Sequence, residues 1–230
     1  MTQDIFSLVN KARKAQNLWE AFSYSEKVRR IKKVEHSLAK KRDKIVELIQ
    51  QENGKLAIDA LAAEVIPALM AIPYYIRLGR RLSKPHVIHG GNLLMSYKRS
   101  YMVHKPWGVI GIISPWNYPF AIPFSEVIMA LLAGNAVILK TASLTPGAGK
   151  IIEEILEAAD LPEGLFVNVD LPGKEAGPAF INSGIDKLFF TGSTSVGKEL
   201  MVLAAQRLLP LTLELRGADA AIARKDADIN

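Results

Sequence analysis

The chain has 230 residues, of which 49% are apolar and 23% charged, and it carries a formal net charge of +6. This composition is ordinary for a globular protein, so it excludes a disordered tail, a collagen-like repeat and a disulfide scaffold. Since the chain contains no cysteine, it can hold no disulfide, zinc–thiolate site, iron–sulfur cluster or cysteine nucleophile of its own.

The first ninety residues carry apolar side chains at helical spacing. The spacing predicts three helical runs, at residues 4–19, 25–53 and 55–81. Gly54 follows the second run as a C-cap would. Pro67 and Pro73 are expected to kink or break the third run. Gly90, Gly91 and Asn92 then end the helical region.

Much of the positive charge lies in residues 27–44, where nine lysines and arginines accompany two acids. Apolar residues recur through this stretch at helical spacing, which predicts an amphipathic helix with a solvated basic face. Nucleic-acid binding is the alternative, but no aromatic side chains are interleaved with the charges as a single-strand binder requires. We therefore expect no specific nucleic-acid partner.

Residues 93–105 alternate in character and include Tyr97, Tyr101 and Val103, which predicts a strand with two mixed faces. From residue 106 onward, short apolar runs alternate with helical ones. The predicted strands are residues 109–113, 136–140, 165–169, 188–191, 211–215 and 220–223. The predicted helices are residues 123–132, 146–159, 174–182 and 196–208. This alternation predicts an α/β fold with a parallel sheet flanked by helices on both faces.

No leader or membrane span is predicted. The first ten residues contain Asp4 and no early positive charge, unlike a signal peptide. The most apolar stretch, residues 127–139, lies between Glu126 and Lys140 and is too short to cross a bilayer. We therefore expect a cytoplasmic protein with no membrane partner and no metal site.

Ligands of an open α/β sheet bind where strands end and helices begin. The predicted junctions are residues 114–119, 140–146, 172–177 and 192–197. The last follows a strand and opens a helix, as a phosphate-binding turn does. Residues 192–198 match the start of a P-loop, but Glu199 replaces the Ser or Thr that would bind Mg²⁺. A tight turn shaped by Gly192 and Gly197 is an equal alternative on the pattern alone.

Three motifs occur in one order along the chain. They are PWNYP within residues 106–119, FTGS at residues 190–193 followed by Gly197, and ELRG at residues 214–217. Together they resemble the PWNYP, FTGS and ELGG segments of the aldehyde dehydrogenase superfamily. The resemblance spans essentially the whole chain and implies a Rossmann-like sheet. It divides the chain into an N-terminal helical region (1–91), an oligomerisation-type strand (92–105) and a dinucleotide-binding domain (106–230).

The resemblance also implies roles for individual residues. Asn117 matches an asparagine whose side-chain amide stabilises the oxyanion, and it could also cap the following turn. Glu214 matches the general base that activates water, whereas the alternative is a surface glutamate on an edge strand. Lys140 matches a lysine that binds the adenosine ribose of NAD or NADP. The other matched cofactor positions are Ile113, Ser114, Pro115, Trp116, Ser143, Gly173, Gly177, Thr191, Gly192, Ser193, Val196, Gly197 and Leu215.

Three features depart from the family pattern. Ser143 stands where a glutamate clasps the ribose and rejects a 2′-phosphate, so the choice between NAD and NADP stays open. Arg216 replaces a glycine beside Glu214, where it would clash, pair with Glu214 or close the cleft. The family's nucleophilic cysteine lies well beyond the general base, and this sequence ends at Asn230 without one. No thiohemiacetal can therefore form on this chain.

The leading hypothesis is a truncated NAD(P)-dependent aldehyde dehydrogenase homologue that cannot oxidise aldehydes to carboxylates alone. A second hypothesis is a non-catalytic nucleotide-binding or subunit-interaction module. A third is a remnant without function, which Arg216 and Ser143 favour. The exposed edge of the strand at residues 93–105 predicts self-association. We therefore expect a homo-oligomer or a missing complementary chain.

Overall fold

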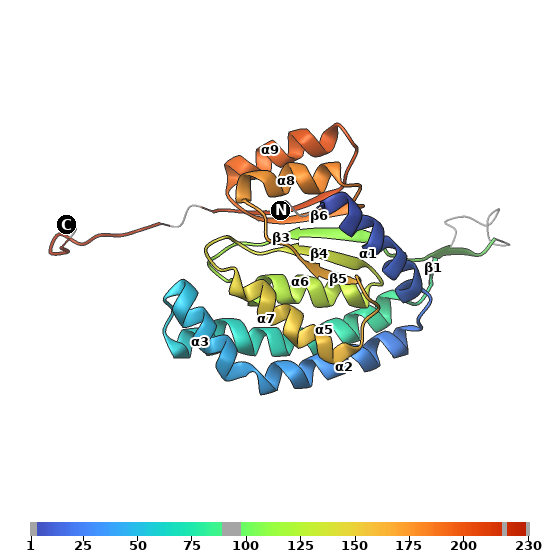
Figure 1. Cartoon of the computed structure of the whole chain (residues 1–230), viewed down its shortest axis with the longest axis horizontal. Coiled ribbons are helices and arrows are strands. Elements are labelled where there is room, and N and C mark those ends of the chain that lie inside the picture. The colour runs from blue at the N-terminus through green and yellow to red at the C-terminus, as the bar shows by residue number, and fades with distance from the viewer. Residues whose placement is uncertain (1–3, 89–97, 218–219, 229–230) are drawn as a thin grey trace.

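The computed structural model describes residues 4–88, 98–217 and 220–228. A parallel sheet lies between two layers of helices (Figure 1). Its strands are β3 (Val109–Ile113), β4 (Ala136–Lys140), β5 (Phe166–Asn168), β6 (Lys187–Gly192) and β7 (Leu211–Leu215). Their order is β5-β4-β3-β6-β7 and every pairing is parallel. The predicted fold class is confirmed.

The strand order reverses beside β3. The chain runs outward from β3 to β4 and β5, then returns across β3 to form β6 and β7. The connecting helices are α6 (Ala121–Leu132), α7 (Gly147–Leu156) with the 3-10 turn η3 (Glu157–Ala159), α8 (Gly173–Asn182) and α9 (Thr194–Ala205). Figure 1 shows α6 and α7 on one face of the sheet and α8 and α9 on the other. The loops after β3 and β6 therefore diverge, which is where such sheets bind ligands.

The N-terminal region is helical, as predicted. It consists of α1 (Ile5–Glu20), α2 (Tyr24–Lys40), α3 (Arg42–Asn53), α4 (Ala57–Ala60), the π-helical turn η1 (Leu61–Val65) and α5 (Ile66–Leu82). Helix α1 packs on β3 and β4, whereas α2 and α5 pack on α6 (Figure 1). Buried Trp19 joins the layers, because its Nε1 donates to the carbonyl of Leu131 at 2.8 Å.

Two of the predicted helical runs are divided. The run at residues 25–53 is interrupted at Lys41, while Gly54, at φ +76°, ends α3 as predicted. The run at residues 55–81 contains a π-helical turn that ends at Val65, and Pro67 lies in the first turn of α5, which follows it. Pro73 lies inside α5 and does not end it.

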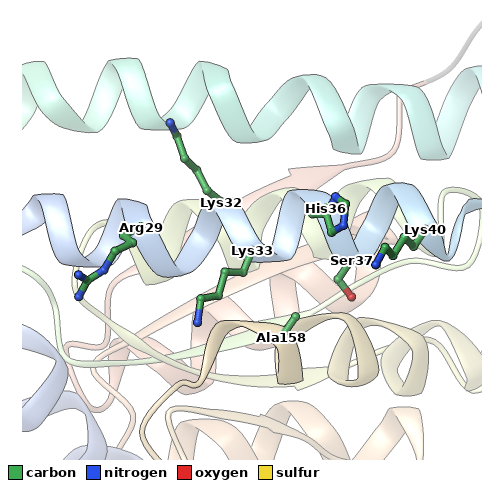
Figure 2. A pocket seen from close by; sticks show the side chains of 7 residues that line it. All are labelled: Arg29, Lys32, Lys33, His36, Ser37, Lys40 and Ala158. Atoms are coloured by element: carbon green, nitrogen blue, oxygen red, sulfur yellow. The ribbon is translucent and has the colours of Figure 1, made fainter.

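Residues 27–40 of the basic stretch lie in α2, which is amphipathic as predicted and has its apolar side chains buried, whereas residues 42–44 belong to α3. Its basic face is only partly free, since Lys33 pairs with Asp160 at 2.6 Å and Lys44 pairs with Glu154 at 2.6 Å. Four basic side chains of α2, those of Arg29, Lys32, Lys33 and Lys40, border a pocket between α2 and η3 (Figure 2). The pocket residues are Arg29, Lys32, Lys33, His36, Ser37, Lys40 and Ala158.

Of the strand predicted at residues 93–105, the structure describes residues 98–105. Within the described residues it is β2 (Ser100–Met102), which pairs antiparallel with β1 (His86–Ile88). Tyr97 and the turn at residues 90–92 lie outside the described residues. All positions of β1 and β2 are exposed. Strand β1 was not predicted, because three exposed residues leave no alternating pattern.

The strand predicted at residues 220–223 is wrong. These residues have no regular structure, and Ile222 is 92% exposed. The chain leaves the sheet after β7 and extends away from it (Figure 1). A short apolar run needs a neighbouring strand to pair its backbone groups, and among the described residues no strand pairs with this segment.

The helical run Ala57–Leu82 is long and apolar enough to cross a membrane by length and composition, which the sequence analysis did not anticipate. In the fold, one face of it packs on α2 and α6, where Ala68 and Ile72 are buried. Its other face exposes Met70 and Tyr74. The run is thus a packed outer helix with a partly exposed apolar side.

Candidate cofactor and active site

The predicted site residues meet at the carboxyl edge of the sheet. Ile113 pairs in register with Lys140 on one side and with Phe190 on the other. Glu214 is opposite Thr191, and Leu215 is opposite Gly192. The parallel register therefore brings the ends of β3, β4, β6 and β7 to one edge, although their residues lie as far apart in sequence as 113 and 215.

Lys140 is a buried cation at the end of β4. Its Nζ lies 3.4 Å from the Oγ of Ser143, and a Cβ placed on Gly173 would be 3.9 Å from the same Nζ. Burial lowers the pKa of Lys140, and the nearby charge of Asp170 opposes this effect. A buried ammonium beside a hydroxyl and an open helix N-terminus is suited to hold ribose hydroxyls or a phosphate.

The turn between β6 and α9 is tightly packed. Ser193 caps α9, since its Oγ accepts from the backbone N–H of Val196 at 3.4 Å. A Cβ on Gly192 would lie 2.6 Å from the ring of Phe190, and one on Gly197 would lie 2.6 Å from Leu215. A side chain at either glycine would therefore require Phe190 or Leu215 to move. A phosphate at this N-terminus stays a prediction.

Gly177 lies in α8, four residues after Gly173 at the start of that helix. It is buried inside α8, and a Cβ there would lie 2.4 Å from the Cδ2 of Leu200 on α9. The absence of a side chain at Gly177 lets α8 and α9 approach each other. Gly173, in contrast, is exposed at the start of α8.

The loop between β3 and α6 carries Asn117. Trp116 and Asn117 are exposed, whereas Ser114 is buried and its Oγ has no hydrogen-bond partner within the described residues. The Asn117 Oδ1 accepts from the backbone N–H of the next residue, Tyr118, at 3.0 Å. Its amide nitrogen remains a free donor among the described residues, which is compatible with the oxyanion role.

Glu214 lies at an exposed strand end. Leu215 is 36% exposed, and the neighbouring Arg216 is exposed as well. Within the part of the chain that the structure describes, Arg216 forms no ion pair with Glu214. The expected pairing of Arg216 with Glu214 is therefore not seen in this structure.

Sequence reasoning missed Glu126, a carboxylate on α6 close to this strand end. Burial, and secondarily the charge of Glu214, raise the pKa of Glu126 from 4.5 to about 7. Its Oε2 is buried without a hydrogen-bond partner among the described residues. The only available signal was one acid inside the apolar run at residues 123–132.

Sequence reasoning also missed the N-terminal residues that contact the loop of Asn117. Asn53 and Lys55 donate hydrogen bonds to its backbone carbonyls, and Glu64 accepts from its last N–H group. Nothing in the sequence pattern indicates these contacts, because they join segments more than fifty residues apart.

The edge of the sheet fits a dinucleotide better than a metal ion. The orphaned Ser114 hydroxyl, the Lys140 ammonium and the start of α9 offer donors to sugar and phosphate oxygens. Across residues 4–88, 98–217 and 220–228, no group of three or more His, Asp or Glu side chains could hold a metal.

Comparisons with known proteins agree with this architecture. A model of the aldehyde dehydrogenase family matches residues 1–230. The 4,4'-diapolycopene aldehyde oxidase of Methylomonas sp is 34% identical over 221 residues, which cover 96% of this chain and 42% of the relative. An aldehyde dehydrogenase from Bacillus cereus, solved in complex with NAD+, is 30% identical with a TM-score of 0.87 and covers 99% of this chain and 46% of that chain.

A second solved structure, an E. coli NADP-dependent enzyme, is 29% identical with a TM-score of 0.85. The match covers 93% of this chain and 44% of that chain. The chain therefore spans less than half the length of the relatives that it matches.

Proposed function

Because the chain belongs to the aldehyde dehydrogenase family, we propose that it is the NAD(P)-binding half of an enzyme that oxidises an aldehyde to a carboxylate. One observation carries this proposal. The Asn117 loop, Lys140 and the start of α9 meet at the edge where the strand order reverses. Such an edge is the usual ligand site of an open α/β sheet.

Each of these groups has a chemical task in the proposal. A bound nicotinamide cofactor would supply the hydride acceptor. Lys140 would hold the ribose hydroxyls, and the N–H groups at the start of α9 would face the phosphates. Asn117 would donate its side-chain N–H to the developing oxyanion, and Glu214 would take a proton from the attacking water.

The chain would not oxidise aldehydes alone, because it has no cysteine. The nucleophile would come from residues outside this sequence. The length of the relatives supports this part of the proposal, since the matched region is less than half of each.

The proposal includes both cofactors. Ser143, beside Lys140, is a neutral residue and would not repel a 2′-phosphate as a carboxylate would. Asp170 is the acid whose charge acts on Lys140. The relatives include a structure in complex with NAD+ and an enzyme described as NADP-dependent.

Thermal unfolding with millimolar NAD+ or NADP+ tests the proposal. A ligand at about 100 times its dissociation constant stabilises the native state by about 2.7 kcal/mol, which corresponds to a rise in Tm of roughly 5–10 °C for a chain of this size. Lys140→Met should abolish the rise, whereas Lys150→Met, at an exposed lysine of α7, should leave it unchanged. A cooperatively unfolding chain whose Tm responds to neither cofactor would contradict the proposal.

A subunit-interaction role is the second candidate, and the ribbon of β1 and β2 favours it. Val87, Tyr101 and Met102 are each at least half exposed on this two-stranded ribbon. Exposed apolar strands of this kind pair readily with another chain. Size-exclusion chromatography with light scattering would show an oligomer, and a monomer at high concentration would contradict this role.

A further inference from the structure

We infer that Glu64 and Lys55 are positioning residues for Asn117: together they hold the loop that carries it in a fixed conformation. This inference rests on the proposed function, in which the Asn117 amide faces the oxyanion. It concerns residues of the N-terminal helices, which lie outside every predicted site motif.

Glu64 provides the first part of the argument. Its side chain is fully buried, and its Oε2 accepts hydrogen bonds from the N–H groups of Phe120 at 3.1 Å and Ala121 at 2.8 Å. These N–H groups lie at the start of α6, where the cap residue offers no side-chain acceptor. The carboxylate therefore satisfies orphan donors and lies at the positive end of the helix dipole.

Lys55 connects Glu64 to Asn117. The Lys55 Nζ donates to the second carboxylate oxygen of Glu64 and to the backbone carbonyl of Asn117, the latter at 2.6 Å. The same Nζ lies 4.1 Å from the centre of the Tyr118 ring. One partly buried cation thus contacts both Asn117 and the residue that follows it.

A third contact comes from the end of α3. The Nδ2 of Asn53 donates to the carbonyl of Trp116 at 2.7 Å. Side chains of Asn53, Lys55 and Glu64 therefore hold the backbone before, at and after Asn117. An exposed loop is normally mobile, so three contacts of this kind are an unusual degree of restraint.

The restraint reaches the Asn117 side chain through the backbone. The Asn117 Oδ1 accepts from the N–H of Tyr118, so the direction of the amide N–H depends on the backbone that Lys55 holds. Electrostatic stabilisation of an oxyanion requires donors that are fixed before the reaction. A loosened loop would lose that orientation while keeping every residue of the motif.

The local structure around Glu64 is consistent with this role. Glu64 lies in the π-helical turn η1 between α4 and α5. Such turns are rare and frequently found at functional sites. A purely structural role would also explain a buried ion pair, so the test must report on the Asn117 amide itself.

Nuclear magnetic resonance of the 15N-labelled chain provides that test. Replacement by aspartate (Asn117→Asp) identifies the side-chain amide signal of Asn117. Glu64→Gln and Lys55→Met should shift and broaden this signal and should speed hydrogen exchange at Phe120 and Ala121 at least tenfold. Lys55→Arg keeps the charge and the donors, so in this variant the Asn117 signal should stay close to that of the unsubstituted chain.

Asp59→Asn is the matched control, since Asp59 is an exposed acid on α4, and it should change nothing in the loop. The side-chain signals of Asn168 and Asn182, which lie on β5 and α8, should stay in place in all variants. An unchanged Asn117 signal in folded Glu64→Gln and Lys55→Met would overturn the inference. Equal changes at Asn168 and Asn182 would also overturn it, because they would indicate a general loss of packing.

This experiment needs no cofactor, so it separates the two proposals. A chain that binds no NAD+ or NADP+ but shows the expected loop response would refute the proposed function and keep the positioning. A normal rise in Tm with cofactor and an unresponsive Asn117 signal would refute the positioning alone.

Discussion

The two residues proposed to act on the reacting atoms, Asn117 and Glu214, lie in very different surroundings. The loop of Asn117 is held by three side chains of the N-terminal helices. Glu214 lies at an exposed strand end where no such contact is present among the described residues. This chain therefore holds the loop of Asn117 through its own side chains, whereas the described residues provide no comparable contact at the end of β7 that carries Glu214.

The strands show the same contrast. Every position of β3 is buried, because β4 and β6 flank it and helices cover both faces. Strand β7 is at the edge of the sheet, and none of its positions is fully buried. The loop after β3 therefore starts from a rigid support, and the loop after β7 does not.

The largest expected effect is a loss of stability on replacing Glu64, which supports the Asn117 loop, compared with replacing Glu214 at the end of β7. Glu64→Ala should lower the free energy of unfolding by about 3–4 kcal/mol, because it leaves the Lys55 charge and two N–H groups without their acceptor. Glu214→Ala should change it by less than about 0.5 kcal/mol, as is usual for an exposed side chain. Urea denaturation measures both. Equal losses in the two variants would refute the contrast.

Glu126 should make the stability depend on pH. Its pKa is raised from 4.5 to about 7 in the folded chain, so folding favours the protonated form. The unfolded chain releases this proton at lower pH, and stability should therefore fall as pH rises from about 4.5 to 7. The full loss above pH 7 should be about 3 kcal/mol.

Urea denaturation at pH 5 and pH 8 measures this dependence. Glu126→Gln should abolish most of it, whereas Glu175→Gln, at an exposed acid of α8, should leave it intact. Glu214→Gln should weaken it slightly, because the charge of Glu214 is the secondary cause of the raised pKa. An identical pH dependence in the wild-type and Glu126→Gln chains would show that Glu126 does not titrate there.

Alanine substitutions at two glycines of α8 should have different effects on the free energy of unfolding, as measured by urea denaturation. Gly177→Ala should destabilise the chain by about 1–2 kcal/mol, since its Cβ would meet Leu200 at 2.4 Å. Gly173→Ala should be neutral within about 0.5 kcal/mol, because its Cβ would meet only the Nζ of Lys140, at 3.9 Å, which is an ordinary contact. If only Gly173→Ala weakens cofactor binding, Gly177 is a packing residue and not a cofactor residue. A neutral Gly177→Ala would argue against the close α8–α9 contact.

The smallest effect concerns an ion pair on the outer layer. Lys33 and Asp160 lie 2.6 Å apart but are 51% and 66% exposed. A double-mutant cycle should assign this pair about 0.2–1 kcal/mol, and salt should reduce the value further. A coupling as large as that of the buried Lys55–Glu64 pair would contradict the distinction between the two.

The sequence predicted the sheet well where burial is complete. The apolar runs at residues 109–113 and 136–140 coincide with β3 and β4, because a strand covered on both faces needs continuous apolar residues. The strand predicted at residues 220–223 was wrong, because no described strand pairs with that apolar run. The helix break at Lys41 was also missed, since neither proline nor glycine marks it.

The candidate site was predicted only in part, for a different reason. The family resemblance pointed to the loop of Asn117, to Lys140 and to the turn at Ser193, because each lies in a short segment whose pattern can be matched by itself. The contacts of Asn53, Lys55 and Glu64 with that loop depend on how α3, η1 and α6 meet in space. Periodicity places Glu64 on a helix but says nothing of its distant partner.

The π-helical turn at Glu64 also limits how this chain can change its length. Each residue of a helix turns the next by about 100°, so one deletion between Lys55 and Glu64 would direct the carboxylate away from the start of α6. The spacing of these two residues is consequently as restrictive as their identity. Insertions should be tolerated among the exposed residues 220–228 and rejected in this short stretch, which no sequence motif marks as part of the site.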